Sequence, residues 1–154
     1  GLGDVYKRQE KYLDYMFYQR RKVSAENLRN ISNTVCYSSV ATASDLEAPV
    51  IVAPSVSGFT TRMLSKWRPK ALIAGLSPSM TAVRQMQLYW GVKPFHAKRA
   101  ESTDALLFAS VELLKEKGIV KEGEIVVATA GVVTRANRHE PVADTNIMRV
   151  IVVE

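Results

Sequence analysis

The sequence contains very little of the chemistry on which metalloenzymes and disulfide-linked domains depend. Its 154 residues include one cysteine and two histidines, too few for an internal disulfide or for a metal site of thiolate and imidazole ligands. No run of about eighteen apolar residues marks a membrane span, and no charged and then apolar leader marks export. We therefore expect a cytoplasmic protein that binds no metal and no cofactor within this chain.

The single cysteine, Cys36, lies in an Ala- and Ser-rich stretch with helical spacing. A buried, unreactive thiol is expected there, because a nucleophilic cysteine needs an exposed and electropositive environment. Trp67 and Trp90 fall near predicted helix ends, where a place in the core or at an interface is expected of them.

Acidic residues are absent from the middle of the chain. No Asp or Glu occurs between Glu47 and Glu101, although eight Lys and Arg do, and the whole chain carries a formal charge of +6. Residues 48–100, the acid-free segment, are therefore suited to anions, either a small phosphate ligand or a nucleic acid. No recognised nucleic-acid-binding motif is present, which favours the small ligand.

The sequence does contain a regular alternation of two patterns, and its length predicts one domain. Short β-branched runs predict strands at residues 50–53, 71–76, 92–97, 125–131 and 147–153. Helical spacing predicts helices from a cap at Ser32 or Asn33 to about residue 46, over 58–67, from 79 to 91, and from a cap at Ser102 or Thr103 to about 117. Because the first of these strands, residues 50–53, is apolar throughout, we expect an α/β fold whose sheet is covered on both faces.

Ligands of open α/β sheets collect outside the carboxyl ends of the parallel strands, where two predicted loops lie. The first follows the first strand and contains Ser55, Ser57, Gly58, Thr60 and Thr61. The glycine permits close backbone approach. The hydroxyls of Ser57, Thr60 and Thr61 can donate to a phosphate at the helix start. The alternative is an ordinary capped helix, which needs only one such hydroxyl.

The second loop, residues 132–145, lies in the segment 129–146 that follows the fourth strand. Its length is typical of functional loops. Arg135 and Arg138 could form forked contacts with a second phosphate, joined by His139. The alternative is a solvated basic loop whose cations pair with Glu140 and Asp144.

Several of these pieces occur together, in this order, in one known family. The set comprises residues 50–52 followed by Ser57-Gly58, then WRPKA (67–71), TAVRQMQL (81–88), WGV (90–92), GEIVV (123–127) and DTNIMRV (144–150). From about Glu10 to its end, the chain resembles the C-terminal domain of pyruvate kinase.

The resemblance implies a three-layer α/β/α sandwich around a mostly parallel sheet of about five strands, the last of them antiparallel. It implies that residues 10–30 form the lead-in helix from a catalytic barrel, so that residues 10–154 are the domain. Residues 1–9 have no apolar period and are expected to be a non-native or disordered leader. The full-length enzyme would transfer phosphate from phosphoenolpyruvate to ADP with Mg²⁺ and K⁺, and this chain alone would be inactive.

The resemblance also implies an allosteric site and a tetramer contact. A sugar phosphate, often fructose 1,6-bisphosphate in this family, would bind the loop formed by Ser55, Val56, Ser57, Gly58, Phe59 and Thr60, together with Arg135 and Arg138. Val56 and Phe59 stand where many activated members have polar residues, and residues 134–143 contain no glycine. The effector therefore stays open between fructose bisphosphate, a sugar monophosphate and a nucleotide, as does an unregulated member. The alternative function is a free-standing phosphate-binding α/β module without kinase activity.

Overall fold

The fold was analysed in a computed structural model that describes residues 30–131 and 145–154. The predicted leader, the predicted lead-in helix up to residue 29 and the predicted site residues Arg135 and Arg138 lie outside the described residues. In chain order, the elements are α4 (Ile31–Asp45), β1 (Val50–Pro54), α5 (Phe59–Lys66), β2 (Leu72–Ser77), α6 (Met80–Met86), β3 (Val92–His96), α7 (Thr103–Glu116), β4 (Ile125–Ala130) and β5 (Ile147–Val152).

The strands form one mixed sheet in the order β3-β2-β1-β4-β5. The pairs β1–β2, β2–β3 and β1–β4 are parallel, and β4–β5 is antiparallel. The expected sheet is thereby confirmed. The chain moves outward from β1 through β2 to β3 and then crosses back to the other side of β1, so the direction of winding reverses between β1 and β4.

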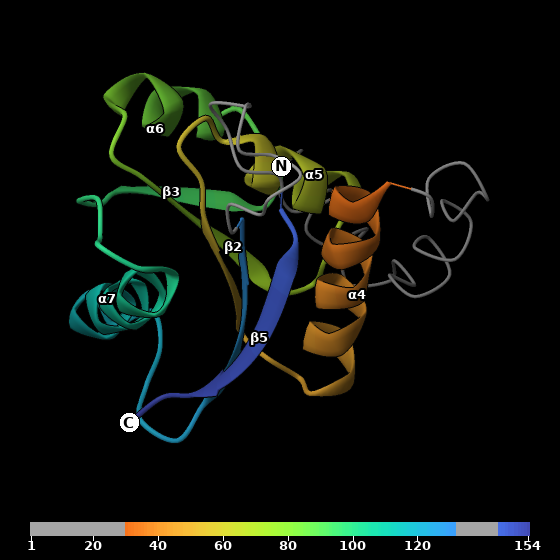
Figure 1. The fold of residues 1–154 in the computed structure, drawn as a ribbon. Helices are drawn as coiled ribbons and strands as arrows, with labels where there is room; N and C mark the ends of the chain where they lie inside the picture. Colours follow the sequence, from red (N-terminus) through yellow and green to blue (C-terminus); the bar gives the residue numbers. More distant parts are fainter. Residues whose placement is uncertain (1–29, 132–144) are drawn as a thin grey trace, which may run out of the picture.

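The helices cover both faces of this sheet, with α4 and α7 on opposite sides (Figure 1). Successive strand residues alternate between two cores, because neighbouring side chains point to opposite faces. Val50 and Val52 of β1 join the core under α7, whereas Ile51 and Ala53 join the core under α4 and α5. The three-layer sandwich is therefore confirmed, and it accounts for strands that are apolar without alternation.

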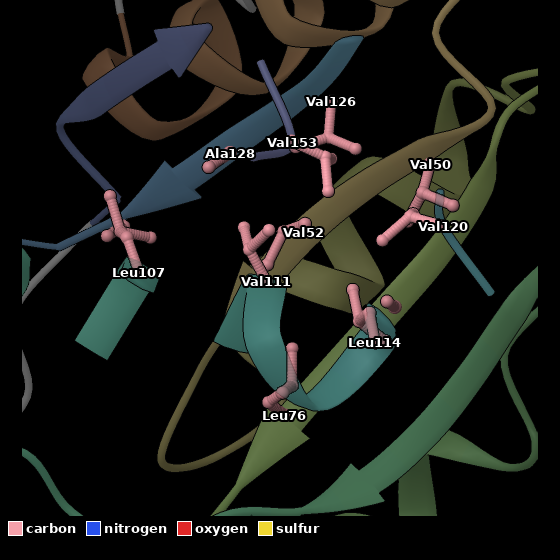
Figure 2. Close-up of a cluster of buried hydrophobic side chains, with 12 residues drawn as sticks. Val50, Val52, Leu76, Leu107, Val111, Leu114, Val120, Val126, Ala128 and Val153 are labelled. Atoms are coloured by element: carbon pink, nitrogen blue, oxygen red, sulfur yellow. The ribbon is translucent and has the colours of Figure 1, made fainter. Parts of the chain in front are cut away.

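The core on the α7 side is built by one stripe of that helix. Leu107, Val111 and Leu114 are buried, recur at helical spacing and lie among the valines of β1 and β4 (Figure 2). The N-cap of α7 is Ser102, whose side chain accepts a hydrogen bond from the backbone N–H of Ala105 at 3.1 Å. Both features match the prediction for this helix.

Two helix ends differ from the prediction. α4 is capped by Asn30, whose side chain accepts a hydrogen bond from the N–H of Asn33 at 3.1 Å, so the predicted cap at Ser32 or Asn33 was wrong. Asn is an equally good cap, and starting earlier places Ser32 in a buried position. α6 ends at Met86 instead of running to residue 91, because the next residues form tighter turns, with Tyr89 N–H donating to Met86 C=O.

Within the described ranges, no helix is long and apolar enough to cross a membrane. The same ranges contain no group of three or more His, Cys, Asp or Glu side chains placed to hold a metal ion.

Cys36 is fully buried in the core under α4, and burial raises the pKa of its thiol from 9.0 to about 12. We expect iodoacetamide at pH 8 to leave the folded chain unmodified and to label it in denaturant, because only the thiolate reacts.

The raised pKa of Cys36 also makes stability depend on pH. Between pH 9 and pH 12 the unfolded chain loses a proton that the folded chain keeps. The free energy of unfolding should therefore fall with rising pH, by at most about 1.4 kcal/mol per pH unit from this group.

The matched control is Cys36→Ala, which should show a smaller fall in stability over the same pH interval. Stoichiometric alkylation of the folded wild-type chain would contradict the assignment of Cys36 as a buried, unreactive thiol.

Candidate functional site

The loop that joins β1 to α5 lies at the point where the winding reverses. β1 ends at Pro54 and α5 begins at Phe59, with Gly58 as its N-cap residue in a left-handed conformation (φ 79°). A Cβ atom at Gly58 would lie 3.1 Å from Cγ of Met86. Glycine is therefore favoured here both by the backbone angle and by the close packing beneath the loop.

The start of α5 has backbone donors without an acceptor inside the helix. The first backbone hydrogen bond of this helix runs from Arg62 N–H to Gly58 C=O at 3.1 Å, so the N–H groups of Phe59, Thr60 and Thr61 have no acceptor within the helix. Phe59 N–H lies 3.4 Å from Ser57 Oγ, which is a long contact for a hydrogen bond. Such a helix start favours an anion, because its N–H groups and the helix dipole point the same way.

The threonine hydroxyls of the loop are partly engaged by the protein itself. Thr61 Oγ1 donates to Gly58 C=O at 2.6 Å and is buried, so the expectation that it donates to a ligand was wrong. Thr60 Oγ1 lies 2.6 Å from Thr145 Oγ1, and either oxygen can be the donor. When Thr145 donates, the Thr60 hydrogen is available to a phosphate. Ser57, by contrast, is exposed.

The loop is fixed to the end of β2 by two hydrogen bonds, and a third holds the Ser77 hydroxyl that makes one of them. Ser55 N–H donates to Leu76 C=O at 2.8 Å, and Ser77 Oγ donates to Val56 C=O at 3.0 Å while it accepts from Ser79 N–H at 3.1 Å. Sequence reasoning did not select Ser77. Its position at the carboxyl end of the neighbouring strand was the available signal.

Beneath the loop, β2, α5 and α6 meet without spare room. A Cβ atom at Gly75 would lie 2.6 Å from Sδ of Met86 and 2.8 Å from Cγ2 of Thr61. Because Met86 also packs against Gly58, the side chain of one α6 residue supports both the strand and the loop. The loop is therefore a rigid part of the fold.

A hollow of about 250 Å³, the switch-point pocket, opens beside this loop. The 55–60 loop lines it through Ser55, Val56, Ser57, Phe59 and Thr60, and further lining residues come from the ends of β1, β2 and β4 and from the start of α7. Five of the six loop residues predicted from the sequence thus lie around one cavity, and Gly58 shapes the turn between them.

Two cations line the pocket that sequence reasoning did not select. Lys98 and Arg99, between β3 and α7, are exposed, and neither side chain has an ion-pair partner among the described residues. They belong to the acid-free segment and follow a strand at its carboxyl end, which was a usable signal. Gly131, the last described residue before the 132–144 segment, also lines the pocket. The predicted contribution of Arg135, Arg138 and His139 lies outside the described residues.

A crevice at the carboxyl ends of two parallel strands, where the winding reverses, defines this chain as a doubly wound α/β domain with a pocket at its switch point, the usual place for a ligand in such folds. Residues 33–151 match the family model described as "Pyruvate kinase, alpha/beta domain". The chain therefore belongs to the pyruvate kinase family and corresponds to its C-terminal domain.

Individual relatives agree with this assignment. The chain is 33% identical to a pyruvate kinase of Clostridium acetobutylicum over 99% of its own length and 31% of that protein. It is 35% identical to a pyruvate kinase of Geobacillus stearothermophilus over 95% of its own length and 24% of the relative. The chain thus spans less than a third of the length of these curated relatives.

Solved structures share the fold. A pyruvate kinase from Cryptosporidium parvum superposes with a TM-score of 0.76 at 21% identity, covering 94% of this chain and 27% of that one. A structure of the Cryptosporidium parvum enzyme in complex with ADP gives a TM-score of 0.74 at 21% identity, covering 92% of this chain and 28% of that one. At this level of identity, the match supports the architecture.

Proposed function

We propose that this chain is the regulatory and oligomerisation domain of a cytoplasmic pyruvate kinase, and that it binds a sugar-phosphate effector in the switch-point pocket. The whole enzyme would transfer phosphate from phosphoenolpyruvate to ADP in glycolysis, giving pyruvate and ATP, with Mg²⁺ and K⁺ bound in a catalytic barrel that residues 10–30 join to this domain. Fructose 1,6-bisphosphate is the effector that the family resemblance suggests first.

One observation carries the effector site: hydroxyl residues, the first residues of a helix and two cations without an ion-pair partner among the described residues all line a single cavity. Ser57 and the first residues of α5 line the pocket at the carboxyl end of the central strand β1, and Lys98 and Arg99 line it from the β3–α7 connection. Charge-assisted hydrogen bonds of this kind contribute roughly 1.5–3 kcal/mol each. Without an anion, two cations would face the same hollow with no partner among the described residues.

The edge strand β5 supports the oligomerisation part of the proposal. Its side chains Met148, Val150 and Val152 are apolar and exposed, and an exposed apolar edge strand is a pairing surface unless it is covered. The proposed assembly is a tetramer, in which this edge is covered by another subunit.

Thermal denaturation with and without a sugar phosphate tests the proposed site. A ligand at about 100 times its dissociation constant should raise the free energy of unfolding by roughly 2.7 kcal/mol, which corresponds to several degrees in Tm for a chain of this size. Fructose 1,6-bisphosphate and ribose 5-phosphate are the first probes. No shift in Tm with any sugar phosphate would leave the 55–60 loop as a plain helix start.

The double variant Lys98→Ala/Arg99→Ala should weaken sugar-phosphate binding by about 10-fold or more, because it removes both cations that would contact the phosphate. The variant Arg135→Ala/Arg138→Ala should weaken it as well if those arginines contact the ligand as proposed. Titration calorimetry measures both effects. Lys115→Ala/Lys117→Ala, which removes two cations from the far end of α7, is the charge-matched control. Equal affinity in this control and in the Lys98/Arg99 variant would remove the latter pair from the site.

A further inference from the structure

The buried pair of hydroxyls that joins α5 to the start of β5 has one more hydrogen than it uses. Thr60 Oγ1 and Thr145 Oγ1 lie 2.6 Å apart, and neither hydroxyl makes a further hydrogen bond among the described residues. A single hydrogen bond between two hydroxyls engages only one of their two hydrogens, because each hydroxyl donates once. The second hydrogen is therefore left for a different acceptor.

Burial decides which of the two hydrogens is left over. Thr145 is 1% exposed and does not line the switch-point pocket, whereas Thr60 is 6% exposed and lines it. If Thr60 donated, the Thr145 hydrogen would stay buried with no acceptor among the described residues, which carries the desolvation cost of an unsatisfied polar group. If Thr145 donates, the Thr60 hydrogen lies on the wall of the pocket, where a ligand can accept it. The burial of the pair therefore favours Thr145 as the donor.

The sheet holds Thr145 in the position that this role requires. The next residue, Asn146, donates its backbone N–H to Ala130 C=O at 3.1 Å, and Ile147 then pairs with Ala130 as β5 begins. The neighbouring hydroxyl of α5 cannot replace that of Thr60, because Thr61 Oγ1 donates to Gly58 C=O at 2.6 Å. Thr60 is therefore the hydroxyl of this helix start whose direction a second residue can set.

We infer that Thr145, which lies 85 positions along the chain from Thr60 and outside the pocket lining, is a positioning residue of the proposed anion site. Its hydroxyl donates to Thr60 Oγ1 and so directs the Thr60 hydrogen toward a phosphate oxygen in the pocket. A hydroxyl that accepts one hydrogen bond is also a stronger donor in the next, because consecutive hydrogen bonds polarise one another. This inference rests on the proposed function, since it adds a residue to the site proposed there.

Exchange of the Thr145 hydroxyl for a methyl group tests the inference by titration calorimetry of the 154-residue chain with ribose 5-phosphate. Thr145→Val keeps the shape of the side chain and removes the donor, so it should weaken binding by about 3–5-fold. Thr145→Ser keeps the donor and should stay within about twofold of the wild-type affinity. A purely structural role of the threonine methyl group would give the opposite order.

A double-mutant cycle shows whether Thr145 acts through Thr60. In a Thr60→Val background, Thr145→Val should change the affinity by less than about twofold, because no hydroxyl remains for it to direct. The matched control is Thr129→Val in β4, which is fully buried and whose Oγ1 has no hydrogen-bond partner among the described residues. This control makes the same exchange of hydroxyl for methyl and should keep the wild-type affinity. The Tm of every variant is measured alongside, and Thr145→Ala takes the place of Thr145→Val in the cycle if the valine variant does not fold.

The outcomes separate this inference from the proposed function. Wild-type affinity in Thr145→Val, an equal loss in Thr145→Ser, or a full further loss in the Thr60→Val background would each overturn the positioning role. Saturable binding of ribose 5-phosphate to the wild-type chain would leave the proposed site standing in all three cases. Absence of saturable binding to the wild-type chain would overturn the proposed site itself, and the inference with it.

Discussion

A glutamate in place of Ser57 is expected to lower the affinity of this chain for any sugar phosphate by about 100-fold or more. Ser57 is exposed at the pocket and lies directly before the left-handed Gly58 that opens α5. A carboxylate there would meet a phosphate dianion at close range, and like charges placed together in a binding site cost several kcal/mol, whereas 100-fold corresponds to about 2.7 kcal/mol. Titration calorimetry with ribose 5-phosphate measures the loss.

The matched control for this substitution is Gln87→Glu, which adds the same charge at an exposed position after α6, outside the pocket lining. It should change the affinity by less than about twofold, because Gln87 does not line the pocket and solvent screens an exposed charge that does not meet the ligand directly. Ser57→Glu should also retain the wild-type Tm, since its side chain lies in solvent. Wild-type affinity in Ser57→Glu would place the phosphate elsewhere.

The second large effect is expected at Gly75, in the middle of β2. An added methyl group would lie 2.6 Å from Met86 Sδ and 2.8 Å from Thr61 Cγ2, and Met86 is fully buried with no open side to move toward. We expect Gly75→Ala to lower the free energy of unfolding by about 1–3 kcal/mol, the range for overpacked cores. Urea denaturation measures this loss.

The same substitution should also weaken sugar-phosphate binding by several-fold, because Met86 and Thr61 both contact Gly58 and their displacement moves the loop. Gly91→Ala is the control: its φ is 69° and a Cβ there meets nothing within 4 Å, so it should lose about 1–2 kcal/mol through backbone strain alone and keep its affinity. If Gly75→Ala proved as stable as wild type, the packing beneath the loop would be looser than described.

The α/β architecture was predictable from local patterns that the tertiary structure reinforces. Strands such as β1 are apolar at every position because α7 and α4 bury alternate residues of the same strand, and continuous apolar runs between helical segments predict this arrangement. Helix ends were less predictable. Asn and Ser are equally favoured as N-cap residues, so the local sequence does not decide between Asn30 and Ser32. α6 ends at Met86 and is followed by turns, although the apolar spacing continues. The antiparallel pairing of β5 was predicted only from the family resemblance.

The part of the candidate site formed by residues adjacent in the sequence was predictable. The part formed by residues that only the fold brings together was not. Ser57 and Gly58 lie between a strand and a helix start, so the role proposed for them follows from the local sequence. Lys98 lies about forty residues away, and only the strand order brings it to the same hollow. The hydrogen bond between Thr60 and Thr145 joins residues 85 positions apart, and no local pattern identifies such a pair.

The account depends most on the claim that the acid-free segment serves one small anion site at the 55–60 loop. Amide chemical shifts of the ¹⁵N-labelled chain during a ribose 5-phosphate titration test it directly. The account predicts saturable shifts concentrated at the backbone amides of Ser57, Gly58, Phe59 and Thr60. Shifts spread over the basic surface without saturation, or the absence of shifts at those four amides, would contradict it.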